Sequence, residues 1–261
     1  FACNPMHVGR DERLPIALYE KDNAAIVSPA YFMFEIIDRD VLNEEYLMMW
    51  FRRPEFDREC WFMTDGSVRG GITWDDLCRI KLPVPSYARQ CEIVESYRAI
   101  TNRIALKRAE NDNLYEMVNA YYTSLFKDIE CEMTTIGNYA ERIYSGGTPT
   151  TSNAAYWGGT FGWFSSGETR NRFVISTEKS ITQTGIDNSS TKLASKHDIV
   201  MASAGQGFTR GQTSMLLIDT YVNQSVIVIH ADRNILPYLF WNLANRYEEL
   251  RAISDSSSIR G

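Results

Sequence analysis

Arginine recurs near asparagine or glutamine on two glycine-containing stretches of this 261-residue chain, SSGETRNR (165–172) and SAGQGFTRGQ (203–212). An arginine can donate two hydrogen bonds to guanine, and an asparagine or glutamine can make two with adenine, at the base edges in the major groove of DNA. This combination of side chains therefore indicates base reading. The candidate residues on the two stretches are Ser166, Arg170, Asn171, Gln206, Thr209, Arg210 and Gln212. For each of them, the alternative is an ordinary solvated turn.

One further stretch in the second half of the chain carries groups suited to phosphate contact. YSGGTPTTSN (144–153) offers the hydroxyls of Thr148 and Thr150 together with glycine N–H groups. In the first half of the chain, NPMHVGRDER (4–13) stands upstream of an apolar run, as 203–212 does in the second half. Its candidate DNA-binding residues are His7, Arg10 and Arg13.

The chain contains a near repeat that ends in Ser-Val-Arg-Gly at residues 67–70 and in Ser-Ile-Arg-Gly at 258–261. Upstream of each copy lie an apolar run, an Asp-Arg turn and a Tyr-Leu pair. The runs at 30–37 and 222–229 predict buried strands, and Asn43 and Asn234 are expected to be helix N-caps. The alternative is two unrelated strand–helix units. Within the repeated ends, Ser67, Arg69, Ser258 and Arg260 are candidate DNA-binding residues, although each arginine could instead brace a turn.

A long helix is predicted between the two copies, because residues 87–128 contain neither proline nor glycine and Ser86 can cap a helix that begins at residue 87. Apolar residues in this stretch have a 4-3 spacing that is interrupted by Lys107 and Asn111, as in a heptad seam that pairs with another helix. About 36 helical residues would span about 54 Å. The expected helix-pairing residues are Ile93, Tyr97, Ile100, Ile104, Asn111, Leu114, Val118, Tyr121 and Leu125. The alternative is an ordinary amphipathic core helix.

Motifs for catalysis and metal binding are missing from the sequence. It has no GxGxxG or GxxxxGK[ST] phosphate loop, no HExxH, and only three widely separated histidines. SPAY (28–31) approaches the (D/N/S)PP(Y/F) loop of amino-methyltransferases but lacks its second proline, and no FxGxG motif accompanies it. The five scattered cysteines form no CxxC pair, which argues against a zinc site or a disulfide framework. We therefore expect no catalytic centre, no metal and no cofactor of the chain's own.

Charge and hydrophobicity restrict the class further. The net charge of −6 disfavours a strongly basic nucleic-acid binder, so a DNA role would need local basic clusters or a basic partner. No stretch of about 18 apolar residues and no signal-peptide pattern is present. A cytoplasmic protein without a membrane partner is therefore expected.

Taken together, the motifs resemble those of the DNA-specificity (S) subunits of type I restriction–modification enzymes. The resemblance extends over nearly the whole chain. In the second half it rests on SGGTPT (145–150), YWGG (156–159), Trp163, ITQTGI (181–186) and VNQ (222–224). In the first half it rests on HVGRDE, IVSPAY, EYL, FDR, GSVRG and, most specifically, ITWDDLCRIKLPVPS (72–86) before QCEIV.

This resemblance implies an α/β (α+β) architecture in which two target-recognition-domain-like globular parts are joined by a long coiled-coil-type helix. The implied parts are residues 1–86, the back of a first recognition domain; 87–129, a conserved spacer helix; and 130–261, a second domain that lacks its last segment and helix. Such a subunit reads a bipartite site on double-stranded DNA and has no catalysis of its own. It recruits methyltransferase (modification) subunits and a restriction/translocase subunit, which would hold S-adenosylmethionine, Mg and ATP.

Two other functions stay open from the sequence. The chain could be the recognition region of a single-chain restriction–methyltransferase, whose catalytic part would lie outside this sequence. It could also be a protein-interaction scaffold, in which the heptad helix mediates self-association and the flanking domains merely fold.

Overall fold

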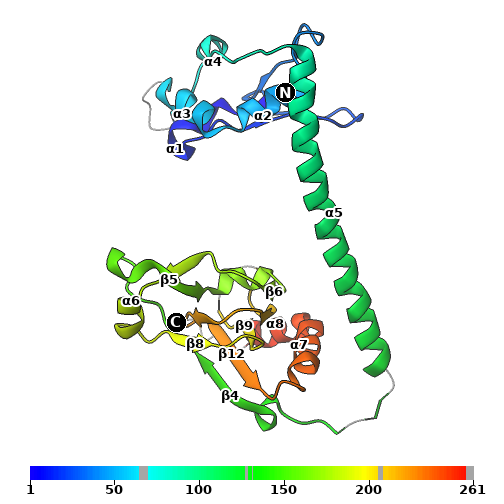
Figure 1. The fold of residues 1–261 in the computed structure, drawn as a ribbon, viewed down its shortest axis with the longest axis vertical. Coiled ribbons are helices and arrows are strands. Elements are labelled where there is room, and N and C mark those ends of the chain that lie inside the picture. The colour runs from blue at the N-terminus through cyan, green and yellow to red at the C-terminus, as the bar shows by residue number, and fades with distance from the viewer. Residues whose placement is uncertain (65–69, 127–128, 131, 205–207, 257–261) are drawn as a thin grey trace. The chain divides into compact units, whose positions relative to one another are not determined.

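The computed structural model describes residues 1–64, 70–126, 129–130, 132–204 and 208–256, with all their side chains except those of His7, Arg10 and residues 253–256. The chain divides into two compact units, Phe1–Tyr115 and Glu116–Gly261, and the division falls inside the long helix α5 (Tyr87–Phe126). Figure 1 shows α5 as one continuous helix. The predicted fold class, two globular α/β parts joined by a long helix, is confirmed. The three-part division at residues 86 and 129 stays a prediction.

The first unit combines short strands with helices. Its antiparallel sheet has the order β2-β1-β3. The strands are β1 (Ala2–Cys3), β2 (Ile16–Ala17) and β3 (Phe32–Met33). The helices before α5 are η1 (Pro5–His7), α1 (Val8–Asp11), α2 (Glu44–Phe51), α3 (Pro54–Phe62) and α4 (Trp74–Arg79).

The apolar core of the first unit contains residues from the start of the chain and from the segment around residue 72. Cys3, Phe56 and Ile72 are buried in one apolar cluster, and burial raises the pKa of the Cys3 thiol to about 12. Gly9 donates its N–H to the carbonyl of Gly70 at 2.9 Å. A Cβ on Gly9 would lie 2.7 Å from the Cα of Gly70, so both positions need glycine. Gly9 and Gly70, which are far apart in sequence, are therefore neighbours.

The buried amide of Gln90 fastens the start of α5 to the first unit. Its side chain is fully buried; Nε2 donates to the carbonyls of Val41 (2.9 Å) and Pro85 (2.8 Å), and Oε1 accepts from the N–H of Asn43 (2.9 Å). Asn43 in turn caps α2, because its Oδ1 accepts from the N–H groups of Glu45 and Tyr46. The predicted cap at Asn43 is confirmed.

The second unit is built on two sheets. One has the order β4-β12-β9-β10-β6 and is antiparallel except for the parallel pair β10–β6; the other has the order β7-β5-β11-β8, with β11 and β5 parallel. The strands are β4 (Ala140–Ser145), β5 (Trp157–Phe164), β6 (Phe173–Val174), β7 (Lys179–Ile181), β8 (Lys192–Ala194), β9 (Ile199–Ala202), β10 (Thr213–Leu216), β11 (Thr220–Val222) and β12 (Val226–Ala231). The helices are η2 (Ile136–Asn138), η3 (Ala154–Tyr156), η4 (Ser166–Arg170), α6 (Gln183–Asp187), α7 (Leu236–Asn245) and α8 (Tyr247–Ser256).

Strands of both sheets supply the core of the second unit, with Phe164, Val200 and Val222 among its fully buried members. Helix α7 packs on the last turns of α5. The ring of Tyr238 lies 5.1 Å from that of Phe126, and Asn245 Nδ2 donates to Asn119 Oδ1 at 2.8 Å. The second unit thus holds its part of α5 through α7, as the first unit does through α2.

Three local predictions were wrong. Residues 30–37 form only the two-residue strand β3, and Ile37 is fully exposed. The run 222–229 is not one strand, since a turn separates β11 from β12. Asn234 does not cap α7: Ile235 occupies that position, and the N–H of Asn234 bonds to Asp232.

In the described part of the chain, no helix is both long enough and apolar enough to cross a membrane.

We expect Gln90→Leu to loosen the attachment of α5 to the first unit. The substitution leaves three backbone groups without a partner, and each such buried group costs about 1–3 kcal/mol. Hydrogen–deuterium exchange should therefore accelerate at least tenfold in peptides covering α2 and the first turns of α5. Gln183→Leu, which removes an exposed amide in the second unit, is the matched control. Unchanged protection in the Gln90 variant would contradict this role.

Candidate nucleic-acid interface

One turn, residues 223–225 between β11 and β12, connects the polar loops of the second unit. The N–H of Asn223 donates to the carbonyl of Phe164, at the end of β5, at 3.1 Å. Its carbonyl accepts from the N–H of Gly146 at 3.2 Å, and its own Oδ1 accepts from Ser225 N–H at 3.0 Å. Asn223 is buried. The turn therefore fixes segments that are far apart in sequence.

The loop after β4 lies directly on this turn. Gly147 N–H donates to the carbonyl of Val222 at 3.0 Å, and Trp163 Nε1 donates to the carbonyl of Gly147 at 3.2 Å. A Cβ on Gly146 would lie 1.9 Å from the Val222 oxygen, so no larger residue fits there. The glycine N–H groups, predicted to contact phosphate, are bonded within the protein instead, and that prediction was wrong. Thr148 Oγ1 bonds to Gln224 Oε1.

The loop between β9 and β10 also begins at the turn, because Ser203 N–H donates to the carbonyl of Ser225 at 2.9 Å. Its far end is closed by two backbone bonds between Ala202 and residues 211 and 212. Helix α8 braces the described part of the loop: Tyr247 Oη donates to the carbonyl of Phe208 at 2.6 Å, and the guanidinium of Arg251 lies 5.3 Å from the Phe208 ring centroid. Phe208 itself is 80% exposed.

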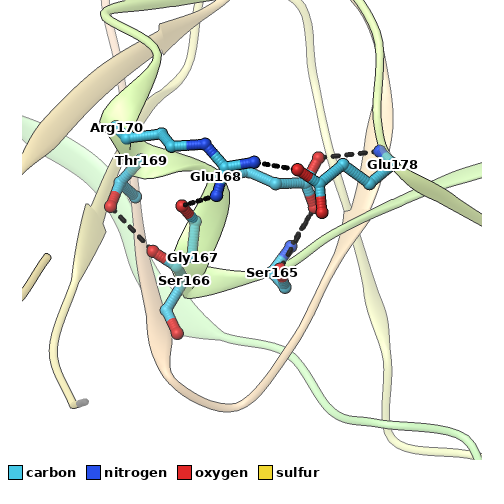
Figure 2. A network of polar contacts seen from close by, with 7 residues as sticks. All are labelled: Ser165, Ser166, Gly167, Glu168, Thr169, Arg170 and Glu178. Atoms are coloured by element: carbon cyan, nitrogen blue, oxygen red, sulfur yellow. Dashed lines mark hydrogen bonds and ion pairs between the residues drawn. The ribbon is translucent and has the colours of Figure 1, made fainter. Parts of the chain in front are cut away.

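The stretch predicted as a loop at 165–172 contains the short helix η4, which is organised by a buried carboxylate. Glu168 is 2% exposed; its Oε1 accepts from the N–H of Ser165 (2.9 Å) and from its hydroxyl (3.1 Å). Its Oε2 accepts from the N–H of Glu178 at 2.9 Å. Figure 2 shows these contacts together with the ion pair between Arg170 and Glu178. Glu168 thus positions two loop segments at once.

Helix η4 is also tied to β10, the strand after the β9–β10 loop. Ser214 Oγ on β10 donates to the carbonyl of Thr169 at 3.2 Å, and both residues are buried. Hydrogen bonds therefore connect the stretches 144–153 and 165–172 and the described part of 203–212 within the second unit.

The structure places the predicted DNA-binding residues in both units. Thr150, Arg170 and Asn171 are exposed, while Thr148, Ser166, Thr209, Arg210 and Gln212 are half-buried, all in the second unit. In the first unit Arg13 is exposed, and the backbones of His7 and Arg10 lie in η1 and α1. Ser67, Arg69, Gln206, Ser258 and Arg260 lie outside the described residues. Their roles in binding stay predictions.

Sequence reasoning missed several residues of this surface. Glu168 and Glu178 were not chosen, although Ser165 and Glu168 have the S-x-x-E spacing of a capping box. The exposure of Phe208 and its contacts with α8 had no sequence signal, because Tyr247 and Arg251 lie about 40 positions further along the chain.

The predicted helix-pairing residues form an exposed apolar stripe on α5. Tyr97, Ile100 and Ile104 are exposed in the first unit, and Tyr97 Oη also accepts from Arg52 at 3.5 Å. Leu114, in the first unit, is exposed too, and the exposed members in the second unit are Val118, Tyr121 and Leu125. Asn111 is exposed and Ile93 is half-buried. Other residues of α5, Tyr122 and Phe126, contact α7 through the ring of Tyr238.

Known proteins resemble this chain in sequence and in structure. It is 28% identical over 182 residues to the specificity subunit of the type I restriction enzyme EcoR124I/EcoR124II of Escherichia coli, a match that covers 65% of this chain and 45% of that protein. The solved S subunit of a type-I restriction-modification system from M. genitalium matches with a TM-score of 0.52 at 13% identity, over 85% of this chain and 58% of that one.

In sequence and in fold, this chain is similar to type I restriction specificity subunits. The resemblance predicted from the motifs is confirmed. The HsdS subunit from Thermoanaerobacter tengcongensis also matches, with a TM-score of 0.40 at 16% identity over 81% of this chain and 55% of that one. No family model matches. The chain spans about half the length of the curated specificity subunit it matches.

The motifs that carry the similarity to specificity subunits have structural roles here. Gly146 and Gly147 of SGGTPT and Asn223 of VNQ make the backbone contacts of the turn, and Trp163 supports Gly147. In the first unit, Gln90 of QCEIV fastens α5. These motif residues therefore make the contacts that hold the backbone in place. The candidate base-reading side chains lie on the loops that these contacts position.

We expect Gly146→Ala to destabilise the second unit. The added methyl group cannot fit 1.9 Å from the Val222 oxygen, so the loop must move away from the turn. Overpacking of this kind costs about 1–3 kcal/mol in urea unfolding. Gly137→Ala is the control, because its Cβ would meet only Thr135 Oγ1, at 3.8 Å. Equal stability of the two variants would contradict the close approach.

Glu168→Ala is expected to destabilise the second unit by about 3 kcal/mol. It leaves the N–H groups of Ser165 and Glu178 and the Ser165 hydroxyl without their acceptor in a buried site. Urea unfolding measures the loss, with Glu141→Ala, at an exposed carboxylate, as the control. A change below about 0.5 kcal/mol would show that Glu168 does not organise η4.

Proposed function

We propose that this chain is a sequence-specific DNA-binding specificity subunit of a type I restriction–modification complex. The observation that carries the proposal is its sequence similarity to the EcoR124I/EcoR124II specificity subunit. The geometry supports it, because the stretches that bear arginine, asparagine and glutamine gather on one surface around the turn at 223–225. Side chains of these types are suited to the edges of bases in the major groove.

In this proposal the second unit reads one half of a bipartite site on double-stranded DNA and the first unit contributes to the other half. The chain performs no catalysis. It recruits methyltransferase (modification) subunits and a restriction/translocase subunit, and S-adenosylmethionine, Mg and ATP belong to these partners. The net charge of −6 fits a subunit that shares its hold on the DNA phosphates with other subunits.

A second candidate function has its own observation. The exposed apolar stripe on α5 favours pairing with another helix, either in a partner subunit or in a second copy of the chain. If that pairing were the whole function, the chain would be an interaction scaffold without DNA preference. A third possibility, that the chain is the recognition region of a single-chain restriction–methyltransferase, would require a catalytic region outside this sequence.

Selection from a randomised duplex library tests the proposal, with the complete chain alone and with the modification subunit of its own system, at two salt concentrations. We expect one enriched half-site, and a loss of preference at single base pairs by a factor of about 5–150 in Arg170→Ala and Arg210→Ala, because one good bidentate contact gives about 1–3 kcal/mol of discrimination. Arg89→Ala, at an exposed arginine on α5, controls for the loss of charge.

The other outcomes separate the alternatives. Salt-sensitive binding without any preferred sequence would indicate backbone contact only. Absence of binding, together with concentration-dependent self-association in sedimentation, would overturn the DNA-specificity proposal and favour the scaffold.

A further inference from the structure

The surface of the second unit presents an arginine and a glutamate as one paired group. Arg170, the last residue of η4, donates from Nη2 to Glu178 Oε1 and from Nη1 to the carbonyl of Gly167 at 3.1 Å. The side chains are 58% and 55% exposed, so both reach solvent while they remain joined. An exposed ion pair contributes little to stability. Stability therefore does not account for an arginine and a glutamate that are held together at this exposed position.

A buried residue, Glu168, fixes the backbone segments that carry both members of this pair. The buried carboxylate of Glu168 binds the N–H of Ser165, at the start of η4, and the N–H of Glu178. Arg170 and Glu178 consequently stand on backbone segments that share one buried anchor, as Figure 2 shows. Such fixation reduces the rotamer freedom that a reading side chain would lose on binding.

Both side chains retain hydrogen-bonding capacity toward solvent. A guanidinium has five N–H donors, and two of those of Arg170 have acceptors among the described residues. Glu178 uses Oε1 for the pair, and no described residue donates to its Oε2. The pair therefore presents donors and an acceptor side by side.

This pattern matches one kind of base pair. In the major groove guanine presents the acceptors O6 and N7, and its partner cytosine presents the N4 amino donor. We propose that Arg170 and Glu178 together read a single G·C base pair, with Arg170 donating to guanine and Glu178 accepting from cytosine N4. The inference rests on the proposed function and adds Glu178 as a specificity-determining residue.

Other DNA groups fit the pair less well. A phosphate accepts from arginine but is repelled by the adjacent carboxylate, so a backbone contact would favour a lone cation. An A·T pair could donate from adenine N6 to Glu178, but its acceptors for Arg170, adenine N7 and thymine O4, lie on different bases, so neither base accepts two hydrogen bonds from the arginine. The G·C pair alone satisfies both side chains with a bidentate contact to guanine.

The test begins with the half-site that the complete wild-type chain selects, and with duplexes in which single bases are altered. Replacing the relevant cytosine by pyrimidin-2-one removes only the N4 amino group, and replacing the paired guanine by 7-deazaguanine removes only N7. Wild-type affinity should fall by about 5- to 100-fold on each replacement at one base pair. Glu178→Ala should lose sensitivity to the cytosine replacement, and Arg170→Ala to the guanine replacement.

Glu92→Ala supplies the matched control, because Glu92 forms an exposed ion pair with Arg89 on α5 and the substitution removes the same charge. It should keep the wild-type response to both analogues. If Glu178 only supports Arg170, wild-type affinity will not respond to the missing amino group, and the inference is overturned.

Two further outcomes have distinct meanings. Selection of an A·T pair at the position that Arg170→Ala relaxes would overturn the inference and leave the proposed function standing. Failure of every variant and of the wild type to select any half-site would overturn both. Because the wild-type measurement with altered DNA needs no protein variant, a folding defect in Glu178→Ala cannot decide the question.

Discussion

The surface of the second unit depends on the main-chain hydrogen bonds of one turn. Residues 222–225 bind Gly146 and Gly147 of the loop after β4, Phe164 at the end of β5, and Ser203 at the start of the β9–β10 loop. These bonds join backbone N–H and C=O groups: every residue carries the carbonyl, and every residue except proline carries the N–H. A frame of this kind leaves most loop side chains free to differ without loss of the fold. Only positions of close approach, such as Gly146, are fixed in residue type.

The long helix depends on a different kind of contact at each end. In the first unit the buried amide of Gln90 satisfies three backbone groups, so its loss would leave them unpaired. In the second unit α5 meets α7 through aromatic rings and the amides of Asn119 and Asn245. Polar bonds fix the register of the first attachment, whereas apolar area dominates the second. Ile100 and Leu114, on the stripe, are 63% and 50% exposed.

Sequence reasoning predicted the elements whose signals are local. The proline-free and glycine-free stretch predicted α5, and Asn43 predicted the start of α2. Sequence reasoning was wrong where tertiary contacts determine the secondary structure. The run 222–229 reads as one strand, yet Asn223 breaks it, because the main chain there bonds to β5 and to the loop after β4.

The candidate site shows the same limit. Arg170 could be chosen from its residue type and its glycine-containing surroundings, and the structure places it on the exposed surface. Glu178 could not, because its pairing with Arg170 depends on how Glu168 folds η4 against the segment before β7. The S-x-x-E spacing was visible in the sequence, but a capping interaction is local and gives no sign that its carboxylate also binds a residue ten positions away.

An acidic chain that recognises DNA would have to separate two electrostatic tasks. Gripping phosphate requires uncompensated positive charge, and it adds affinity for every sequence alike. Reading a base requires directed donors and acceptors, and an arginine paired with a glutamate supplies both without net charge. Such a pair adds little attraction to random DNA, so it raises the ratio of specific to non-specific binding rather than affinity itself. Under the proposed function, a net charge of −6 is then no obstacle to selectivity. Under that proposal, contact with the DNA backbone falls mainly to partner subunits.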